Sequence, residues 1–188
     1  MTAKLDASAL IYLNKAGLLD LAVRVCDELV ITQAVYDECV VRGRRAGHRD
    51  AEAIQEVINV GTLRVVSLNE SGQQRLTAAN FDRRLGRGEQ ETIIEALEKD
   101  CLTVLDDIRA RSAAAVLGAN LSRTETLVLE ALVRGLVGPV DFEKHLLRLA
   151  QVRGMRADEL SELLRIGHLI IEVMSHDRAN DRPEGFTD

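Results

Sequence analysis

Short apolar β-like runs alternate with longer helical segments through residues 1–118, and this alternation limits the possible folds more than any other feature. The β-like runs lie at residues 4–5, 27–32, 63–67 and 101–105. Each is followed by residues with the three-to-four residue apolar spacing of helices. Strands separated by helices pair in parallel through right-handed crossovers. We therefore predict an α/β fold, a three-layer α/β/α sandwich with a central parallel sheet.

The pattern changes after about Gly118. Three apolar-periodic segments, at residues 124–138, 142–154 and 156–174, follow one another with glycines between them. The final segment is polar and contains one Pro and one Gly, a composition typical of disorder. We predict a main domain over 1–135, a C-terminal helical extension over 136–174 packed on it, and a disordered tail over 175–188.

Composition excludes several classes of protein. Hydrophobic residues make up 46% of the 188 residues and charged residues 29%, a globular balance. The formal net charge of −6 argues against a broad coat of nucleic acid. No segment approaches the roughly 20 apolar residues of a membrane span. We also expect no secretory leader, because Asp6 interrupts the first apolar residues. We expect a cytoplasmic protein that does not bind membranes.

The thiols and imidazoles do not form a site for a soft metal. The three cysteines stand among apolar residues without a CxxC pair, so we expect buried free thiols: Cys26, Cys39 and Cys101. The four histidines have no ligand-like neighbours: His48, His145, His168 and His176. Any metal would therefore be a hard cation bound by oxygens.

Carboxylates follow two of the predicted strands. Asp6 comes directly after residues 4–5, and Asp106 and Asp107 come after 101–105. Ligands of open parallel sheets bind at the carboxyl ends of the strands. Each aspartate alone could be an ordinary helix cap. Because acids occur at both equivalent places, we favour a functional site at this edge.

Two predicted helices contribute further acids. In "TQAVYDECV", Glu38 flanks the apolar ridge, whereas Asp37 lies on the open face. In "LGRGEQETIIEALE", Glu89 and Glu91 stand in a first turn, where acids also complement the helix dipole. The spacing does not choose between Glu89 and Glu91, because they flank the apolar stripe on opposite sides.

Several carboxylates in one pocket would repel one another, and divalent cations remove that repulsion. Mg²⁺ or Mn²⁺ prefers oxygen ligands and can activate water for phosphodiester cleavage. No Ser–His–Asp arrangement, Walker loop or GxGxxG motif competes with this interpretation. The sequence therefore predicts a Mg²⁺ or Mn²⁺ site.

Four ordered blocks, "LDASALIYLNKAGLL", "VYDECV", "LGRGEQETIIEALE" and "VLDDIRARSAA", resemble PIN-domain proteins. The likeness covers residues 3–135, and the remaining helical segments resemble the end of a prokaryotic subgroup. The resemblance implies an α/β/α fold and a Mg²⁺- or Mn²⁺-dependent ribonuclease. It also implies RNA as substrate, a homodimer, and a VapC-like toxin role with an antitoxin protein as partner.

Carried over residue by residue, the resemblance implies that Asp6, Glu38, Glu91 and Asp106 are catalytic. The implied metal ligands include two further acids and are Asp6, Glu38, Glu89, Glu91, Asp106 and Asp107. The family pattern has four acids. Glu91 matches the third acid more naturally than Glu89 does, and the fourth acid lies in the pair Asp106–Asp107. Two departures stand out. Leu105 occupies a position where toxin-type members carry Thr or Ser, and "ANLSRTETLV" replaces a glycine-containing strand.

Two arginine-rich segments, "RGRRAGHR" and "DRRLGRG", could grip a phosphate backbone or could be solvated loops. Two other readings compete with the ribonuclease. One is a non-catalytic PIN-fold module that binds RNA or protein, which Leu105 favours slightly. The other is a phosphatase-like or flap-nuclease relative acting on DNA, which the short chain disfavours.

Overall fold

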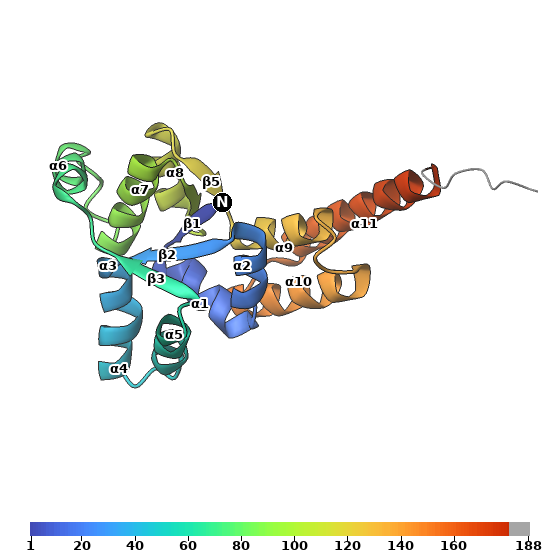
Figure 1. Cartoon of the computed structure of the whole chain (residues 1–188), viewed down its shortest axis with the longest axis horizontal. Helices are drawn as coiled ribbons and strands as arrows, with labels where there is room; N and C mark the ends of the chain where they lie inside the picture. The colour runs from blue at the N-terminus through green and yellow to red at the C-terminus, as the bar shows by residue number, and fades with distance from the viewer. Residues whose placement is uncertain (181–188) are drawn as a thin grey trace, which may run out of the picture.

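The computed structural model describes residues 1–180. Five short strands form one parallel sheet in the order β3-β2-β1-β4-β5. The strands are β1 (Thr2–Leu5), β2 (Glu28–Thr32), β3 (Leu63–Val66), β4 (Leu102–Val104) and β5 (Asn120–Ser122). Ala3 of β1 is in register with Leu29 of β2 and Leu102 of β4. The predicted parallel α/β sandwich is confirmed (Figure 1).

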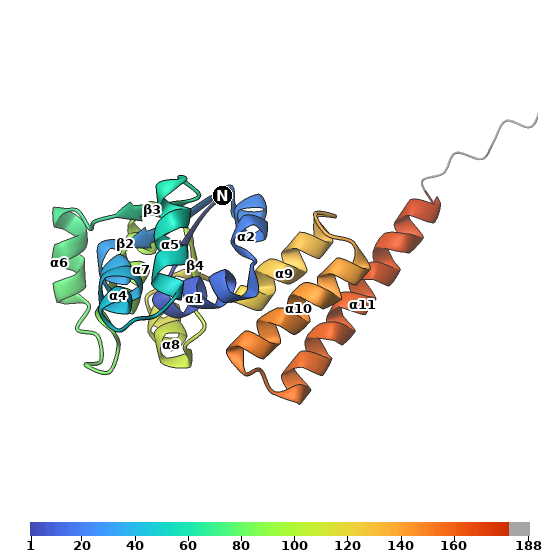
Figure 2. The same cartoon turned by 90° about the horizontal axis from the view of Figure 1, so that it is seen from below.

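The helices of the sandwich are α1 (Ala7–Ala16), α2 (Leu19–Cys26), α3 (Gln33–Tyr36), α4 (Gly43–Arg45), α5 (Asp50–Asn59), α6 (Glu70–Ala78), α7 (Arg87–Lys99) and α8 (Ile108–Val116). A π-helical turn, η1 (Asp37–Arg42), joins α3 to α4 without a break. Helix α7 packs on β1, β2 and β4. Figure 2 shows α1 and α5 on the opposite side of the sheet from α7. The sheet is thus covered on both faces, as its apolar strands require.

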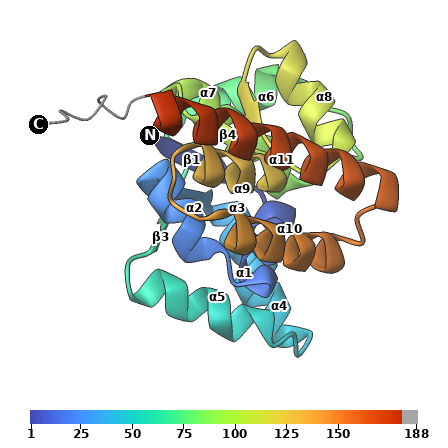
Figure 3. The ribbon, with the colours of Figure 1, turned by 90° about the vertical axis from the view of Figure 1, so that its right-hand side faces the viewer.

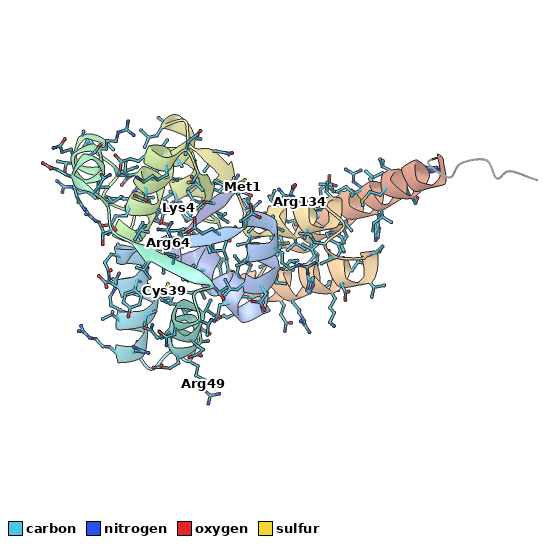
Figure 4. The ribbon with its side chains drawn as sticks, viewed as in Figure 1. Met1, Lys4, Cys39, Arg49, Arg64 and Arg134 are labelled. Carbon is cyan, nitrogen blue, oxygen red and sulfur yellow. The ribbon has the colours of Figure 1, made fainter. Side chains whose placement is uncertain are left out.

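Three more helices follow β5: α9 (Thr124–Val133), α10 (Pro139–Arg153) and α11 (Ala157–Asn180). They lie side by side at one end of the sandwich (Figures 2 and 3). Arg134, at the end of α9, donates to the backbone carbonyl of Val25 at the end of α2 over 2.9 Å (Figure 4). The predicted boundary between residues 135 and 136 falls in the turn that joins α9 to α10.

Helix α10 contributes to the main hydrophobic core. Phe142, Leu146 and Leu149 are fully buried and belong to the same cluster as Leu5 and Leu10. Helix α11 approaches α10 closely at Gly167, where an added Cβ would overlap the Phe142 ring. The C-terminal helices therefore share the core of the sandwich.

Two expectations about the C-terminal part need correction. Helix α11 continues to Asn180, so residues 175–180 are helical where we expected the tail to begin. The rest of that predicted tail, 181–188, lies outside the described residues. Residues 120–122 form β5, paired in parallel with β4. A strand is therefore present although this segment contains no glycine, because the backbone can pair with β4 whatever side chains it carries.

Among residues 1–180, no helix has the length and apolarity that crossing a membrane requires. Of the three cysteines, Cys26 and Cys39 are buried and Cys101 is partly exposed, and none forms a disulfide. Burial raises the pKa of the Cys39 thiol to about 12 and that of Cys26 to about 11. Such thiols stay protonated at neutral pH.

Candidate active site

Asp6 lies at the carboxyl end of β1, the central strand of the sheet. It caps α1, and its Oδ1 accepts a hydrogen bond from the Ala9 backbone N–H over 2.7 Å. The side chain is fully buried, and its Oδ2 has no hydrogen-bond partner. A buried polar atom without a partner costs free energy. Capping alone therefore explains only one of the two carboxylate oxygens.

The electrostatic environment of Asp6 is unfavourable for a negative charge. Burial raises its pKa to about 8, and repulsion from Asp106, Glu89 and Asp107 adds to this, while the bond from Ala9 opposes it. Carboxylates from β4, α7 and the start of α8 therefore surround the end of β1. This is the convergence expected where parallel strands end at one edge of a sheet.

The adjacent aspartates after β4 have different environments. The side chain of Asp106 is 3% exposed. Its Oδ2 accepts from the Thr124 hydroxyl over 2.9 Å and its Oδ1 from the Thr124 backbone N–H over 3.3 Å. Asp107 is exposed and caps α8, with its Oδ1 accepting from the backbone N–H groups of Arg109 and Ala110. Asp106 therefore faces the interior, and Asp107 serves as a helix cap.

Glu89 lies in the first turn of α7, and its charge is coupled to those of Asp6, Asp107 and Glu38. Its carboxylate accepts from the Gly86 backbone N–H over 2.7 Å. Partial burial raises its pKa, as do the charges of Asp107 and Glu38, while the Gly86 bond and Arg109 lower it. These couplings place Glu89 in the group around Asp6.

Glu91 lies outside this group. It is buried, with Oε1 accepting from the Arg87 guanidinium over 2.7 Å and Oε2 from the Ala34 backbone N–H over 3.3 Å. It thus ties α7 to α3. Arg87 stands four residues before Glu91, the spacing of a helical ion pair. That spacing was a sequence signal for a structural role of Glu91.

Glu38 projects from the π-helical turn η1. Its side chain is 43% exposed, and its Oε2 lies 3.4 Å from Arg42. A Cβ at Gly88 would lie 3.2 Å from that same oxygen and 3.1 Å from Val35. The absence of a side chain at Gly88 thus allows α7 and η1 to approach closely. π-Helical turns occur frequently at functional sites.

The group around Asp6 therefore consists of Glu38, Glu89, Asp106 and Asp107, whose oxygens are the donor type that hard divalent cations prefer. Among the side chains that the structure describes, those of residues 1–176, no three Asp, Glu, His or Cys side chains are arranged to hold an ion. Glu89 turns toward Gly86 and Glu38 toward Arg42 instead. The buried Oδ2 of Asp6, which has no hydrogen-bond partner, and the all-oxygen donor set around it fit Mg²⁺ or Mn²⁺ in their chemistry.

Sequence reasoning missed three residues beside Asp106. Thr124 and Glu125 begin α9, and Arg153 ends α10. The Arg153 guanidinium lies 3.7 Å from Asp106. From the sequence, Glu125 is an ordinary acid in the first turn of a helix. The sequence pattern of α10 does not predict that Arg153 lies near the end of β4. Only the packing of α10 against α1 and α9 brings these side chains together.

The predicted basic segments are largely paired with acids. Arg44 makes two hydrogen bonds to Glu52, and Arg84 pairs with Asp82. Arg49, labelled in Figure 4, projects away from the body of the protein. Arg109 lies close enough to Glu89 to lower its pKa. Arg42 of the first segment also contacts Glu38, so Arg42 and Arg109 are both coupled to the acidic group.

A parallel α/β sandwich with carboxylates gathered at the carboxyl edge of its sheet is the arrangement of a PIN domain. The family model DUF3368, PIN domain, matches residues 4–165, so the chain belongs to this PIN-domain family. PIN domains generally include metal-dependent nucleases. The match extends through α10 into α11, and it thus includes most of the predicted helical extension.

A solved structure, a PilT N-terminus domain protein from the hyperthermophilic archaeon Sulfolobus solfataricus P2, is similar to this chain. The sequence identity is 19% and the TM-score 0.43, over 68% of this chain and 90% of the other. No curated protein matches the sequence.

Proposed function

We propose that this protein is a metal-dependent endoribonuclease whose ion is held by Asp6, Glu38, Glu89 and Asp106. The observation that carries the proposal is Asp6: fully buried, with one oxygen lacking a partner and with its pKa raised to about 8 beside other acids. Such a carboxyl costs free energy unless it keeps a proton or binds a cation, and strongly perturbed pKa values cluster at functional sites. Membership of the PIN-domain family supports the same conclusion.

A bound Mg²⁺ or Mn²⁺ would supply charge stabilisation and an activated water for hydrolysis of a phosphodiester bond. Asp6 would hold the ion through its Oδ2, which has no partner, because its Oδ1 already accepts from the Ala9 backbone N–H. Glu38 from η1, Glu89 from α7 and Asp106 after β4 would supply the remaining carboxylates. Asp107 keeps α8 in place through its cap, and Arg109, two residues further on, is available to an RNA phosphate. Glu91 is left to its structural bond with Arg87 and Ala34.

A non-catalytic PIN-fold module that binds RNA or protein is the second candidate. Leu105 is fully buried at the position where toxin-type members carry a hydroxyl. Position 105 therefore supplies no hydroxyl to the site, and the hydroxyl that donates to Asp106 comes from Thr124 instead. The toxin role, the antitoxin partner, the homodimer and the cytoplasmic location stay predictions. An antitoxin would fit by placing a basic side chain against Asp6.

Cleavage of a mixed pool of single-stranded and structured RNA tests the proposal. The purified protein is incubated with Mg²⁺, with Mn²⁺ and with EDTA, and the Asp6→Asn variant is treated in the same way. We expect cleavage that requires a divalent cation and is lost in Asp6→Asn. Asparagine retains a side-chain oxygen that can cap α1, so loss of activity would report the missing charge and not an unfolded helix.

Asp37→Asn is the matched control. Asp37 neighbours Glu38 on η1, is exposed, and bonds only to Gln33 among the side chains of residues 1–180. It should keep wild-type cleavage. Folded wild-type protein, free of co-purified inhibitor, that binds RNA but does not cut it with either cation would contradict the ribonuclease and support the binding module.

A further inference from the structure

Arg153 is a buried cation next to the candidate active site. It is the last residue of α10, and its side chain is only 9% exposed. Its guanidinium carbon lies 5.9 Å from the centre of the Tyr12 ring of α1. Helix α10 thus delivers a permanent positive charge to the carboxyl edge of the sheet, because arginine does not deprotonate in proteins.

This guanidinium bridges two buried carboxylates. Its Nη1 lies 2.5 Å from Glu125 Oε2, and its Nη2 lies 3.7 Å from Asp106 Oδ1. The side chains of Asp106 and Glu125 are each 3% exposed. The guanidinium therefore lies between two converging carboxylates, at a position that a divalent ion could otherwise occupy.

The second oxygen of Glu125 is also engaged. Arg123 Nε lies 2.6 Å from Glu125 Oε1, and Arg123 Nη2 lies 2.8 Å from Glu159 of α11. Glu125 therefore has an arginine on each oxygen and no free oxygen for a metal. The network Arg123–Glu125–Arg153 continues to α11 through Glu159, so the C-terminal helices hold it in place.

The same network decides what Asp106 can do. Because Glu125 binds Arg153 at 2.5 Å, the guanidinium stays 3.7 Å from Asp106 instead of forming a close pair with it. Each Asp106 oxygen accepts one hydrogen bond from Thr124, so each keeps a further lone pair with which to bind an ion. A divalent ion placed between Asp106 and Glu125 would meet Arg153 at close range, where like charges repel strongly in a poorly solvated site.

We infer that Arg153 occupies the place of a second divalent cation, so that the acidic group takes one ion, with Glu125 holding the guanidinium off Asp106. This inference rests on the proposed metal-dependent function and deepens it. Arg153 and Glu125 are positioning residues, since they act on the ion through Asp106. The C-terminal helices then contribute residues that position a ligand of the site.

Counting bound Mn²⁺ tests the inference. Isothermal titration calorimetry and the loss of the free Mn²⁺ signal in electron paramagnetic resonance give the number of ions per chain. We expect one for the wild type, two for Arg153→Gln, and one again for Arg153→Lys, which restores the charge. Arg156→Gln, at a side chain 81% exposed and three residues away, is the control and should match the wild type.

Glu125→Gln gives an independent result if Arg153→Gln does not fold. Without its main partner, Arg153 should pair closely with Asp106, and Mn²⁺ affinity should fall about 10-fold, the size typical of groups that support metal ligands. Two ions on the wild type, one ion on folded Arg153→Gln, or unchanged affinity in Glu125→Gln would each overturn the inference. If Asp6→Asn alone abolishes binding while these variants behave as wild type, the metal site stands and the role of Arg153 falls. No Mn²⁺ on the wild type would overturn both proposals.

Discussion

The carboxyl edge of the sheet and the junction of α9 with the C-terminal helices treat buried negative charge in opposite ways. At the junction, Glu125 is 3% exposed and has an arginine on each oxygen. At the edge, Asp6 is fully buried, has one oxygen without a partner, and faces other acids. At the junction, where the carboxylate has a structural role, each of its oxygens is therefore paired with an arginine. Burial raises the pKa of both carboxyls, but arginines oppose the shift at Glu125, whereas neighbouring acids add to it at Asp6.

The largest effect that we expect comes from breaking the junction at its core. Phe142→Ala removes a fully buried ring that packs against Gly167 of α11. Such a truncation should lower the free energy of unfolding by about 4 kcal/mol, from lost burial and the cavity left behind. Chemical denaturation followed by circular dichroism measures it.

Because α10 shares the main core, the transition of Phe142→Ala should remain single. Leu147→Ala is the matched control, since Leu147 lies on the same helix with its side chain 49% exposed. It should change stability little. Two separate transitions would show that the C-terminal helices unfold independently and would weaken the comparison.

Neutralising Asp6 should stabilise the protein, in contrast to the damage at the junction. The pKa of Asp6 is raised from 3.8 to about 8, so the folded state keeps its proton where the unfolded chain has lost it. This contribution to stability is complete below about pH 4 and is lost as pH rises to about 8. Asparagine cannot ionise, so Asp6→Asn does not lose stability in this way.

In EDTA at pH 8, the free energy of unfolding of Asp6→Asn should therefore exceed that of the wild type by about 3 kcal/mol. This is below the upper limit set by about 1.4 kcal/mol for each unit of pKa shift. Near pH 4 the two free energies should agree. Urea unfolding at both pH values measures the difference. Added Mn²⁺ should stabilise the wild type and not the variant. Equal stabilities at pH 8 would contradict the unfavourable environment assigned to Asp6.

The smallest effect concerns Asp107, which caps α8 at the rim of the acidic edge. Asp107→Ala removes the oxygen that accepts from Arg109 and Ala110. The loss of a cap should cost about 1 kcal/mol. Asp107→Asn, which keeps the acceptor, should cost less. Thermal unfolding of the two variants separates the cap from the charge, and equal losses would assign the effect to charge.

Much of the fold could be predicted, because each segment carries its own pattern. Apolar runs separated by helical periodicity predicted a parallel sheet, and β1, β2, β3 and β4 are present where expected. The three-residue strand β5 was missed, since residues 120–122 are short and partly exposed. The continuation of α11 to Asn180 was missed because polar composition does not prevent a helix that neighbouring helices support.

Some residues of the acidic site could likewise be predicted from the sequence, and others could not. Asp6, Asp106 and Asp107 follow strands of a parallel sheet, so their shared edge follows from the order of elements alone. Glu89 and Glu91 lie two residues apart on one helix, and the choice between them depends on what each side of α7 meets. Val35 and Glu38 approach the Gly88 side, while Ala34 binds Glu91.

The sequence by itself determined the parallel α/β architecture, the strand-end acids and the acid-bearing helices, because periodicity and chain order act within each element. Only the tertiary structure decided that Glu89 joins the acidic group, that Glu91 serves α3, and that Arg153 reaches Asp106. Those outcomes depend on how helices cross and approach. Residues 106 and 153 are far apart in the chain, and no local pattern encodes the 3.7 Å between their side chains.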